Sequence, residues 1–154
     1  MASADQLHVI VTDGLGRLVR RRSLGRWLAD VAPRAARHGE VAVALVSDRR
    51  MRALNRRFRG ADRPTDVLSF PVEPPPRPRA AAMAGGRRFL GDIVIATGVA
   101  RRQAGEAGHA LDVELRRLVL HGLLHLVGYD HERDRGEMAR IERHLRRRGG
   151  VPED

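Results

Sequence analysis

Cysteine and lysine are both absent from the 154-residue chain. No disulfide can form, and any metal site must be built from histidine and carboxylate ligands. Aromatic residues make up only 3% of the sequence, which argues against a platform that stacks nucleic-acid bases in the manner of RRM domains. The sequence also lacks an N-terminal apolar segment of the secretory type and any apolar run near the roughly 20 residues of a membrane span. We therefore expect a cytoplasmic protein without membrane contact.

All 29 basic residues are arginine, and they outnumber the 19 acidic residues to give a net charge of +10 and a pI near 11.6. Phosphate-rich molecules are the expected partners of such a chain. A base-composition bias of the genome is an alternative explanation for the missing lysine, but it explains the choice of arginine better than the net charge. The length suits a single domain over residues 1–154 with a substantial core.

Hydrophobic periodicity and turn residues divide the chain into strands and helices. Short runs rich in β-branched residues predict strands at 8–13, 40–47, 67–70 and about 89–96. Helical spacing predicts one or two helices within 15–38 and single helices at about 48–57, 97–105, 110–127 and 132–148. Residues 58–66 are expected to form a loop. The Pro/Ala/Gly-rich segment 74–86 is expected to be an excursion between two strands that pair antiparallel.

Three histidines with the spacing H-x3-H-x5-H form the clearest candidate site. His121 and His125 are four residues apart, so on a helix they share one face, about 6 Å apart along the axis. Gly128 allows the chain to turn, and the turn would bring His131 back as a third ligand. Three protein ligands with a fourth position open are typical of catalytic zinc, whereas structural zinc sites close with four. The alternative is that the first two are ordinary helix histidines and that His131 caps the last helix.

Gly122 stands where zinc metalloproteases carry the glutamate that acts as general base, which argues against a peptidase. Glycine inside a helix costs about 1 kcal/mol relative to alanine, so a close approach by neighbouring backbone or substrate, or simple packing, is expected there. On this helix Glu114, Arg117 and the two histidines trace a polar stripe opposite an apolar face, and we expect the stripe to border a cleft.

Three sequence motifs stand out in the chain. The first is the histidine segment His121-Gly-Leu-Leu-His-Leu-Val-Gly-Tyr-Asp-His131. The second is Leu54-Asn-Arg-Arg-Phe-Arg-Gly-Ala-Asp-Arg-Pro-Thr-Asp-Val-Leu-Ser-Phe-Pro71, and the third is Leu90-Gly-Asp-Ile-Val-Ile95. Together they resemble the motifs of the YbeY family, bacterial single-strand-specific endoribonucleases that act in ribosomal RNA maturation and ribosome quality control. Their order and spacing agree with the family from about residue 41 to 142. Phe58 and Ala96 depart from it, since tyrosine and serine are usual there.

The resemblance implies that His121, His125 and His131 bind one zinc ion per chain, although imidazoles also suit other first-row divalent metals. It implies that Arg59 is the functional arginine of the second motif, where a guanidinium fork matches phosphate oxygens. It further implies a compact α+β fold in which a small mixed sheet of about four strands packs with about five helices. A metal cleft is then expected beside the histidine-bearing helix.

The remaining candidates are charged residues near these motifs. Asp66 and Asp92 are candidates for orienting a metal-bound histidine, and loop capping and strand-edge exposure are equally good explanations for them. Arginines that would give salt-dependent affinity for RNA are Arg56, Arg57, Arg87 and Arg88.

The partners expected of such a protein are single-stranded or ribosomal RNA and the ribosome or small-subunit assembly proteins. The nucleophile, a metal-activated water or the 2′-hydroxyl of the RNA, is left open, as is the general base. Two alternative functions are a ribosome-assembly factor with a mainly structural metal and a metal-dependent peptidase-like hydrolase.

Overall fold

The computed structural model describes residues 5–18, 22–72, 87–130 and 132–152. The strands in these ranges are β1 (His8–Asp13), β2 (Gly39–Val46), β3 (Val67–Pro71) and β4 (Arg88–Ala96). The helices are α1 (Arg22–Val31), the short 3-10 helix η1 (Arg34–Ala36), α2 (Asp48–Arg59), α4 (Thr97–Ala107), α5 (Leu111–Leu126) and α6 (Glu137–Arg148). The predicted α+β class is confirmed, with four strands and five α-helices in the described part of the chain.

The four strands form one mixed sheet in the order β1-β2-β4-β3. β1 pairs with β2 and β2 with β4 in parallel, whereas β3 runs antiparallel to β4, with Ser69 opposite Ile93. The antiparallel pairing predicted for these two strands is therefore confirmed. The excursion predicted at 74–86, which joins them, lies outside the described residues.

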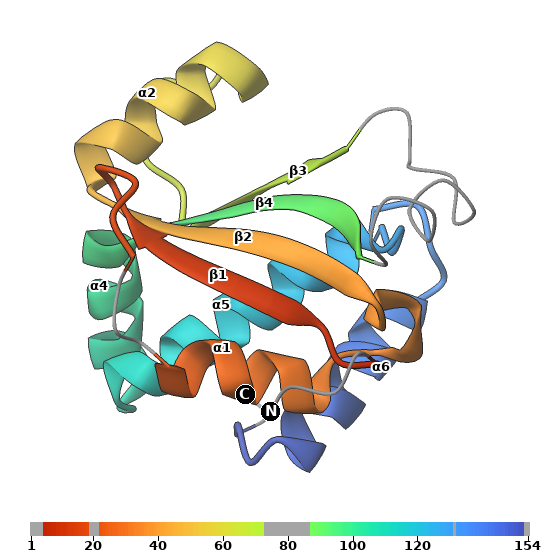
Figure 1. The fold of residues 1–154 in the computed structure, drawn as a ribbon. Coiled ribbons are helices and arrows are strands. Elements are labelled where there is room, and N and C mark those ends of the chain that lie inside the picture. The colour runs from red at the N-terminus through yellow and green to blue at the C-terminus, as the bar shows by residue number, and fades with distance from the viewer. Residues whose placement is uncertain (1–4, 19–21, 73–86, 131, 153–154) are drawn as a thin grey trace.

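The two faces of the sheet are covered to different extents. Below the sheet in Figure 1 lie α1, α5 and α6, and the main core forms there between inward-facing residues such as Val43 and Ile93 and the buried leucines of α5. Above it lies α2, which buries Met51 against Leu68 and Val94 in a smaller cluster. Among the described helices, only α2 packs on this face, and it covers part of it (Figure 1), while Phe89 and Asp92 on the same face are exposed.

α5 is the helix around which the main core is built. Its buried residues include Leu115, Leu118, Leu123 and Leu124, which pack in the cluster formed with the sheet. Gly122 is buried on the same helix, and a Cβ atom there would lie 2.8 Å from Cγ2 of Ile93 and 3.1 Å from Oγ of Ser69. The glycine is therefore explained by close packing between α5 and the sheet, one of the explanations expected from the sequence.

Two helix boundaries differ from the sequence prediction. α2 continues through Phe58 to Arg59, which were expected in a loop, and ends at Gly60 in the left-handed conformation with φ of 71°. α6 starts at Glu137 rather than near residue 132, because the Asp134 carboxylate accepts hydrogen bonds from the backbone N–H groups of Gly136 and Met138, both at 2.8 Å. These bonds hold the preceding segment in a turn.

Helix α6 packs through the three residues expected from its pattern. Met138 and Leu145 are buried, and Ile141 packs partly buried against the main core. Within the described ranges, none of the helices combines the length and hydropathy needed to cross a membrane.

Candidate metal centre

His121 and His125 lie in the last two turns of α5, and their rings face one another. Their Nε2 atoms are 3.2 Å apart, and the ring centroids are 4.8 Å apart with an interplanar angle of 74°. Two nitrogens that each lie about 2.05 Å from one tetrahedral ion are separated by about 3.3 Å. The observed separation of the two Nε2 atoms therefore suits joint ligation of one zinc-like ion.

Glu142, on α6, holds the other nitrogen of His121. Its Oε2 lies 3.2 Å from Nδ1 of His121, and its side chain is only 14% exposed. A hydrogen on Nδ1 would be donated to this carboxylate, which leaves the Nε2 lone pair directed at His125. A carboxylate behind an imidazole in this way is the usual device that fixes the tautomer and ring orientation of a metal ligand.

Sequence reasoning did not select Glu142 as a functional residue. A signal was present, because Glu142 follows Met138 by four residues and precedes Leu145 by three. Residues with these spacings share one helix face, and the other two were predicted to face the core. A carboxylate on an otherwise buried stripe needs a partner, and here that partner is His121.

His131, the third predicted ligand, lies outside the described residues. Within the described ranges no group of three or more histidine, aspartate or glutamate side chains is arranged to hold a metal. The His121 and His125 pair is thus the part of the predicted site that the structure brings together, and the third ligand stays a prediction.

Glu114, predicted to lie on a polar stripe that borders a cleft, is buried at 1% exposure. Its Oε2 lies 2.8 Å from Nε2 of His109, and Arg117 donates to both of its carboxylate oxygens. Burial acts to raise the pKa of Glu114, but hydrogen bonds from Arg117 and His109 outweigh it and bring the pKa below its ordinary value. The prediction was wrong for this residue because helical spacing shows which residues share a face and not which partners bury them.

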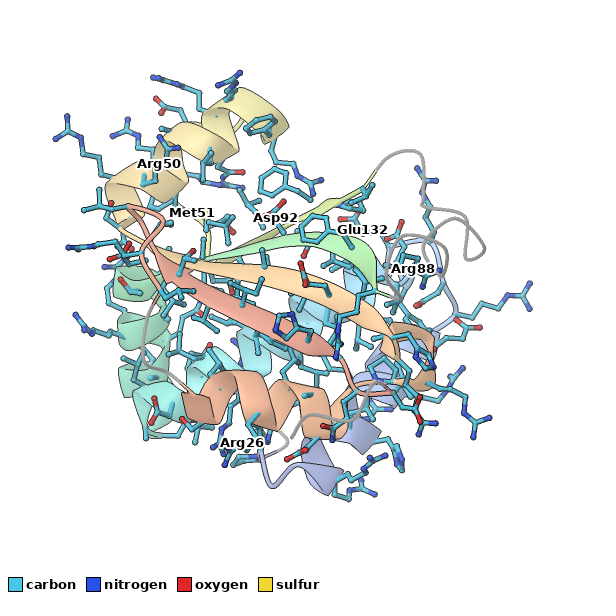
Figure 2. The ribbon with its side chains drawn as sticks, viewed as in Figure 1. Arg26, Arg50, Met51, Arg88, Asp92 and Glu132 are labelled. Carbon is cyan, nitrogen blue, oxygen red and sulfur yellow. The ribbon has the colours of Figure 1, made fainter. Side chains whose placement is uncertain are left out.

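The two candidate aspartates lie away from the histidine pair. Asp66 accepts hydrogen bonds from the backbone N–H of Val67 at 2.8 Å and from Nε2 of Gln103 at 3.3 Å. Asp92 points from β4 toward the α2 side of the sheet, opposite the face on which α5 packs (Figure 2). Among the described residues neither aspartate forms a hydrogen bond with a histidine, and the carboxylate beside His121 is Glu142 instead.

Arg59 is the last residue of α2 and is exposed. Since α2 and α5 pack on opposite faces of the sheet, Arg59 lies on the other side of the sheet from the histidines. In the ranges that the structure covers, no hydrogen bond or ion pair joins Arg59 to either histidine. The structure thus does not place Arg59 beside the metal centre.

The four predicted RNA-binding arginines fall into two pairs. Arg56 and Arg57 are exposed on α2, and the Arg57 guanidinium lies 5.2 Å from the centroid of the Phe58 ring. Arg87 and Arg88 donate instead to backbone carbonyls, those of Gln6 at 2.8 Å and Ala35 at 3.3 Å. The second pair is therefore partly engaged within the fold, and the first is available to an external ligand.

Comparison with known proteins shows the same similarity over most of the chain. A family model described as Endoribonuclease YbeY matches residues 20–149. Relatives named Endoribonuclease YbeY include one from an Anaeromyxobacter species, 46% identical over 138 residues that make up 88% of this chain and 68% of the relative. Another, from Koribacter versatilis, is 45% identical over 134 residues, 87% of this chain and 80% of the relative. A solution structure of a Thermotoga maritima protein matches with a TM-score of 0.58 at 28% identity and covers 89% of this chain and 85% of that one.

Proposed function

This chain belongs to the YbeY endoribonuclease family, and from that premise we propose that it is a metal-dependent endoribonuclease that cleaves single-stranded RNA in ribosomal RNA maturation. Ribosomal RNA and the proteins that assemble the small ribosomal subunit are its proposed partners. The observation that carries the metal dependence is the pair of Nε2 atoms of His121 and His125, 3.2 Å apart. The net charge of +10 suits a polyanionic substrate.

The residues of α5 and α6 would hold the ion. His121 and His125 supply two nitrogens, His131 is proposed as the third ligand, and Glu142 fixes the orientation of His121 through Nδ1. When bound, a zinc-like ion supplies Lewis acidity, which polarises a phosphoryl oxygen and promotes ionisation of water. The first-row metals other than zinc that accept imidazole ligands would supply the same chemistry.

Arg59 is proposed as a phosphate-binding residue. A guanidinium presents paired N–H donors that match two phosphate oxygens, and this geometry favours phosphodiester recognition. Because α2 and α5 lie on opposite faces of the sheet, we propose that Arg59 binds a phosphate of the same RNA strand away from the ion. The other exposed arginines of α2 would add affinity that depends on salt and not on sequence.

Replacement of one ligand tests this function. We expect His125→Ala to lose bound zinc and RNA cleavage together, because one of the two facing nitrogens is removed. The matched control is His144→Ala, since His144 is exposed on α6 and away from the facing pair. Metal content by elemental analysis and cleavage of a labelled single-stranded RNA are measured on the same preparations. A metal-free His125→Ala protein with full activity would contradict the proposal.

Arg59→Ala separates the nuclease from the alternative of an assembly factor with a structural metal. As a nuclease, the variant keeps its fold and its metal but binds the RNA about tenfold more weakly, seen as a raised KM for cleavage, because a charge-assisted contact with a phosphate away from the ion is lost. Unchanged cleavage with lost ribosome association would favour the assembly factor. The peptidase alternative is disfavoured because Gly122 stands where a zinc metalloprotease carries its general base.

A further inference from the structure

The open face of the sheet carries a groove that the metal centre does not use. It has a volume of about 370 Å³ and lies between α2, the end of β1 and the upper surface of β2, β4 and β3. Ala44 and Val94 contribute apolar floor, and Phe58, Phe70 and Asp92 also line it. A concave, largely apolar site of this size with a few polar groups has the character of a small-ligand subsite.

Two aromatic rings stand at this groove, although aromatic residues are rare in the chain. The Phe58 and Phe70 rings meet edge to face with centroids 5.2 Å apart, and Phe58 is 53% exposed. Phe89, opposite Glu40 in the sheet register, lies on the same face and is also exposed. All three phenylalanines of the sequence thus gather on one sheet face. Exposed rings such as those of Phe58 and Phe89 are what unpaired nucleic-acid bases stack on.

A carboxylate at the same groove has no hydrogen-bond donor among the described residues. Figure 2 shows Asp92 on the side of the sheet that carries Met51 and α2. In the part of the chain that the structure describes, no hydrogen bond or ion pair engages the exposed Asp92 carboxylate, and partial desolvation by the groove around it raises its pKa. Asp13, the other carboxylate of the lining, is already satisfied by Arg17 and by two backbone N–H groups. Asp92 is therefore the acceptor that a ligand with N–H donors would meet.

The charge around the groove favours a ligand that carries phosphate. Arg50 is exposed and lines the groove from α2 (Figure 2), and Arg56 and Arg57 continue the positive charge along the same helix. Arginine recognises phosphate oxygens through its fork of donors. A nucleotide fits this pattern, with its base in the groove and its phosphate toward α2.

Asp92 can only accept hydrogen bonds, so it favours those RNA bases that present donor groups. An ionised carboxylate accepts through two oxygens and donates nothing. Guanine alone among the four RNA bases presents two adjacent donor groups, N1–H and N2–H, on its Watson–Crick edge. Adenine presents an acceptor beside its single amino donor there, and inosine lacks the N2 amino group.

We infer that this groove binds an unpaired guanine of the RNA, with the base against Phe58 and Phe70 and its N1–H and N2–H groups donating to Asp92. The inference rests on the proposed function, because it takes the ligand to be that RNA substrate. The groove and the histidine pair lie on opposite faces of the sheet. The site would therefore fix the strand at a guanine some distance from the bond that is cleaved.

The test uses the full chain with chelator present, so that binding is measured without cleavage. Three fluorescent single-stranded heptamers are compared by anisotropy, in which uridines flank a central guanine, inosine or adenine. We expect the guanine heptamer to bind about tenfold more tightly than the inosine heptamer, and the inosine heptamer to bind more tightly than the adenine heptamer. Each replacement removes one charge-assisted hydrogen bond to Asp92. Equal affinity for the three heptamers would overturn the inference.

Variants assign the preference to the groove. Asp92→Asn, at an exposed position, is expected to abolish the preference for guanine, and Phe58→Ala to weaken all three heptamers by about tenfold. The matched control is Glu106→Gln, which changes an exposed carboxylate on α4 outside the groove and should leave all affinities unchanged. An Asp92→Asn protein that keeps the preference would overturn the assignment.

Two further measurements distinguish a failure of the groove assignment from a failure of the proposed nuclease function. Guanosine monophosphate should bind at least tenfold more weakly than the guanine heptamer, and equal binding would assign the groove to a free nucleotide instead of RNA. Cleavage of a longer RNA by the metal-loaded protein tests the proposed function alone. Cleavage without guanine preference rejects only the groove, and guanine preference without cleavage rejects only the nuclease.

Discussion

A single carboxylate, that of Glu142, sets which nitrogen of His121 is available to an ion. The Nδ1 atom lies 3.2 Å from Glu142, and the Nε2 atom lies at the same distance from Nε2 of His125. Glu142 belongs to α6, so the ligand geometry depends on contact between two helices. The orientation of His121 is therefore a tertiary property, which spacing within one helix cannot supply.

Removal of this carboxylate should weaken metal binding without unfolding the protein. We expect Glu142→Ala to lower zinc affinity by about 10-fold to 100-fold, the usual effect of losing the partner of a ligating imidazole. Competition with a chromophoric chelator measures the affinity, and Glu106→Ala, at an exposed position of α4, serves as the control. Equal zinc affinity in the two variants would show that Glu142 does not orient His121.

Glu114 gives a prediction about stability and pH. Burial acts to raise the pKa of its carboxyl, but donors from Arg117 and His109 bring it below the ordinary value of 4.5. A group whose pKa is lower in the folded state stabilises the fold above the unfolded pKa and loses this contribution as the pH falls through the folded pKa. The stabilisation by Glu114 should therefore be complete at pH 7 and disappear in acid below pH 4.5.

The variant Glu114→Gln isolates this contribution. At pH 7 it should lower the free energy of unfolding by about 3–5 kcal/mol, because the buried carboxylate is neutralised while the Arg117 cation is left in place. The difference from the wild type should shrink as the pH is lowered below 4.5. Urea denaturation over this pH range measures it. A difference that stays constant with pH would mean that the charge of Glu114 is not what stabilises the fold.

At the scale of the element, α5 joins the core to the metal centre. The helix lies close to β3 and β4 because Gly122 has no side chain, and the Ser69 hydroxyl donates to the Gly122 carbonyl at 3.1 Å. The next turn carries His125, so the packing of Gly122 fixes the height of the histidines relative to the sheet. Gly122, which replaces the glutamate of the protease pattern, thus has a structural role here.

Two glycine substitutions separate packing from helix propensity. Gly105→Ala in α4 should stabilise the protein by about 1 kcal/mol, since no atom lies within 4 Å of the added Cβ and alanine favours the helix. Gly122→Ala gains the same propensity, but its Cβ would meet Ile93 at 2.8 Å, and overpacking costs about 1–3 kcal/mol. Thermal unfolding of both variants should therefore move in opposite directions. Stabilisation by Gly122→Ala would contradict the close-packing account.

The positions of most elements could be predicted from the sequence. The strand at 8–13 has the same bounds in the prediction and the structure, since β-branched alternation is a local signal. The errors lie at ends set by side-chain or backbone details, such as the Asp134 turn before α6 and the extension of α2 through Arg59. Glu142 was missed because its partner is on another helix.

At the scale of the whole molecule, the sheet divides two candidate functional surfaces. The histidine pair lies on the side of α5, and the aromatic groove and the arginines of α2 lie on the other. Composition gives the amount of each residue type but not its place in the fold. The aromatic content of 3% argued against base stacking. In the structure, however, the three phenylalanines lie on one face of the sheet. Likewise, Arg59 was expected to complete the metal cleft, but it ends α2, which packs on the opposite face of the sheet from α5.

The central claim is that the histidine pair holds an ion on which RNA cleavage depends. Elemental analysis of the purified wild type is combined with cleavage of a labelled single-stranded RNA before chelation, after chelation and after zinc is restored. The account predicts about one zinc-like ion per chain, loss of cleavage in step with loss of the ion, and recovery when the ion is returned. Full cleavage by protein shown to be free of metal would contradict it.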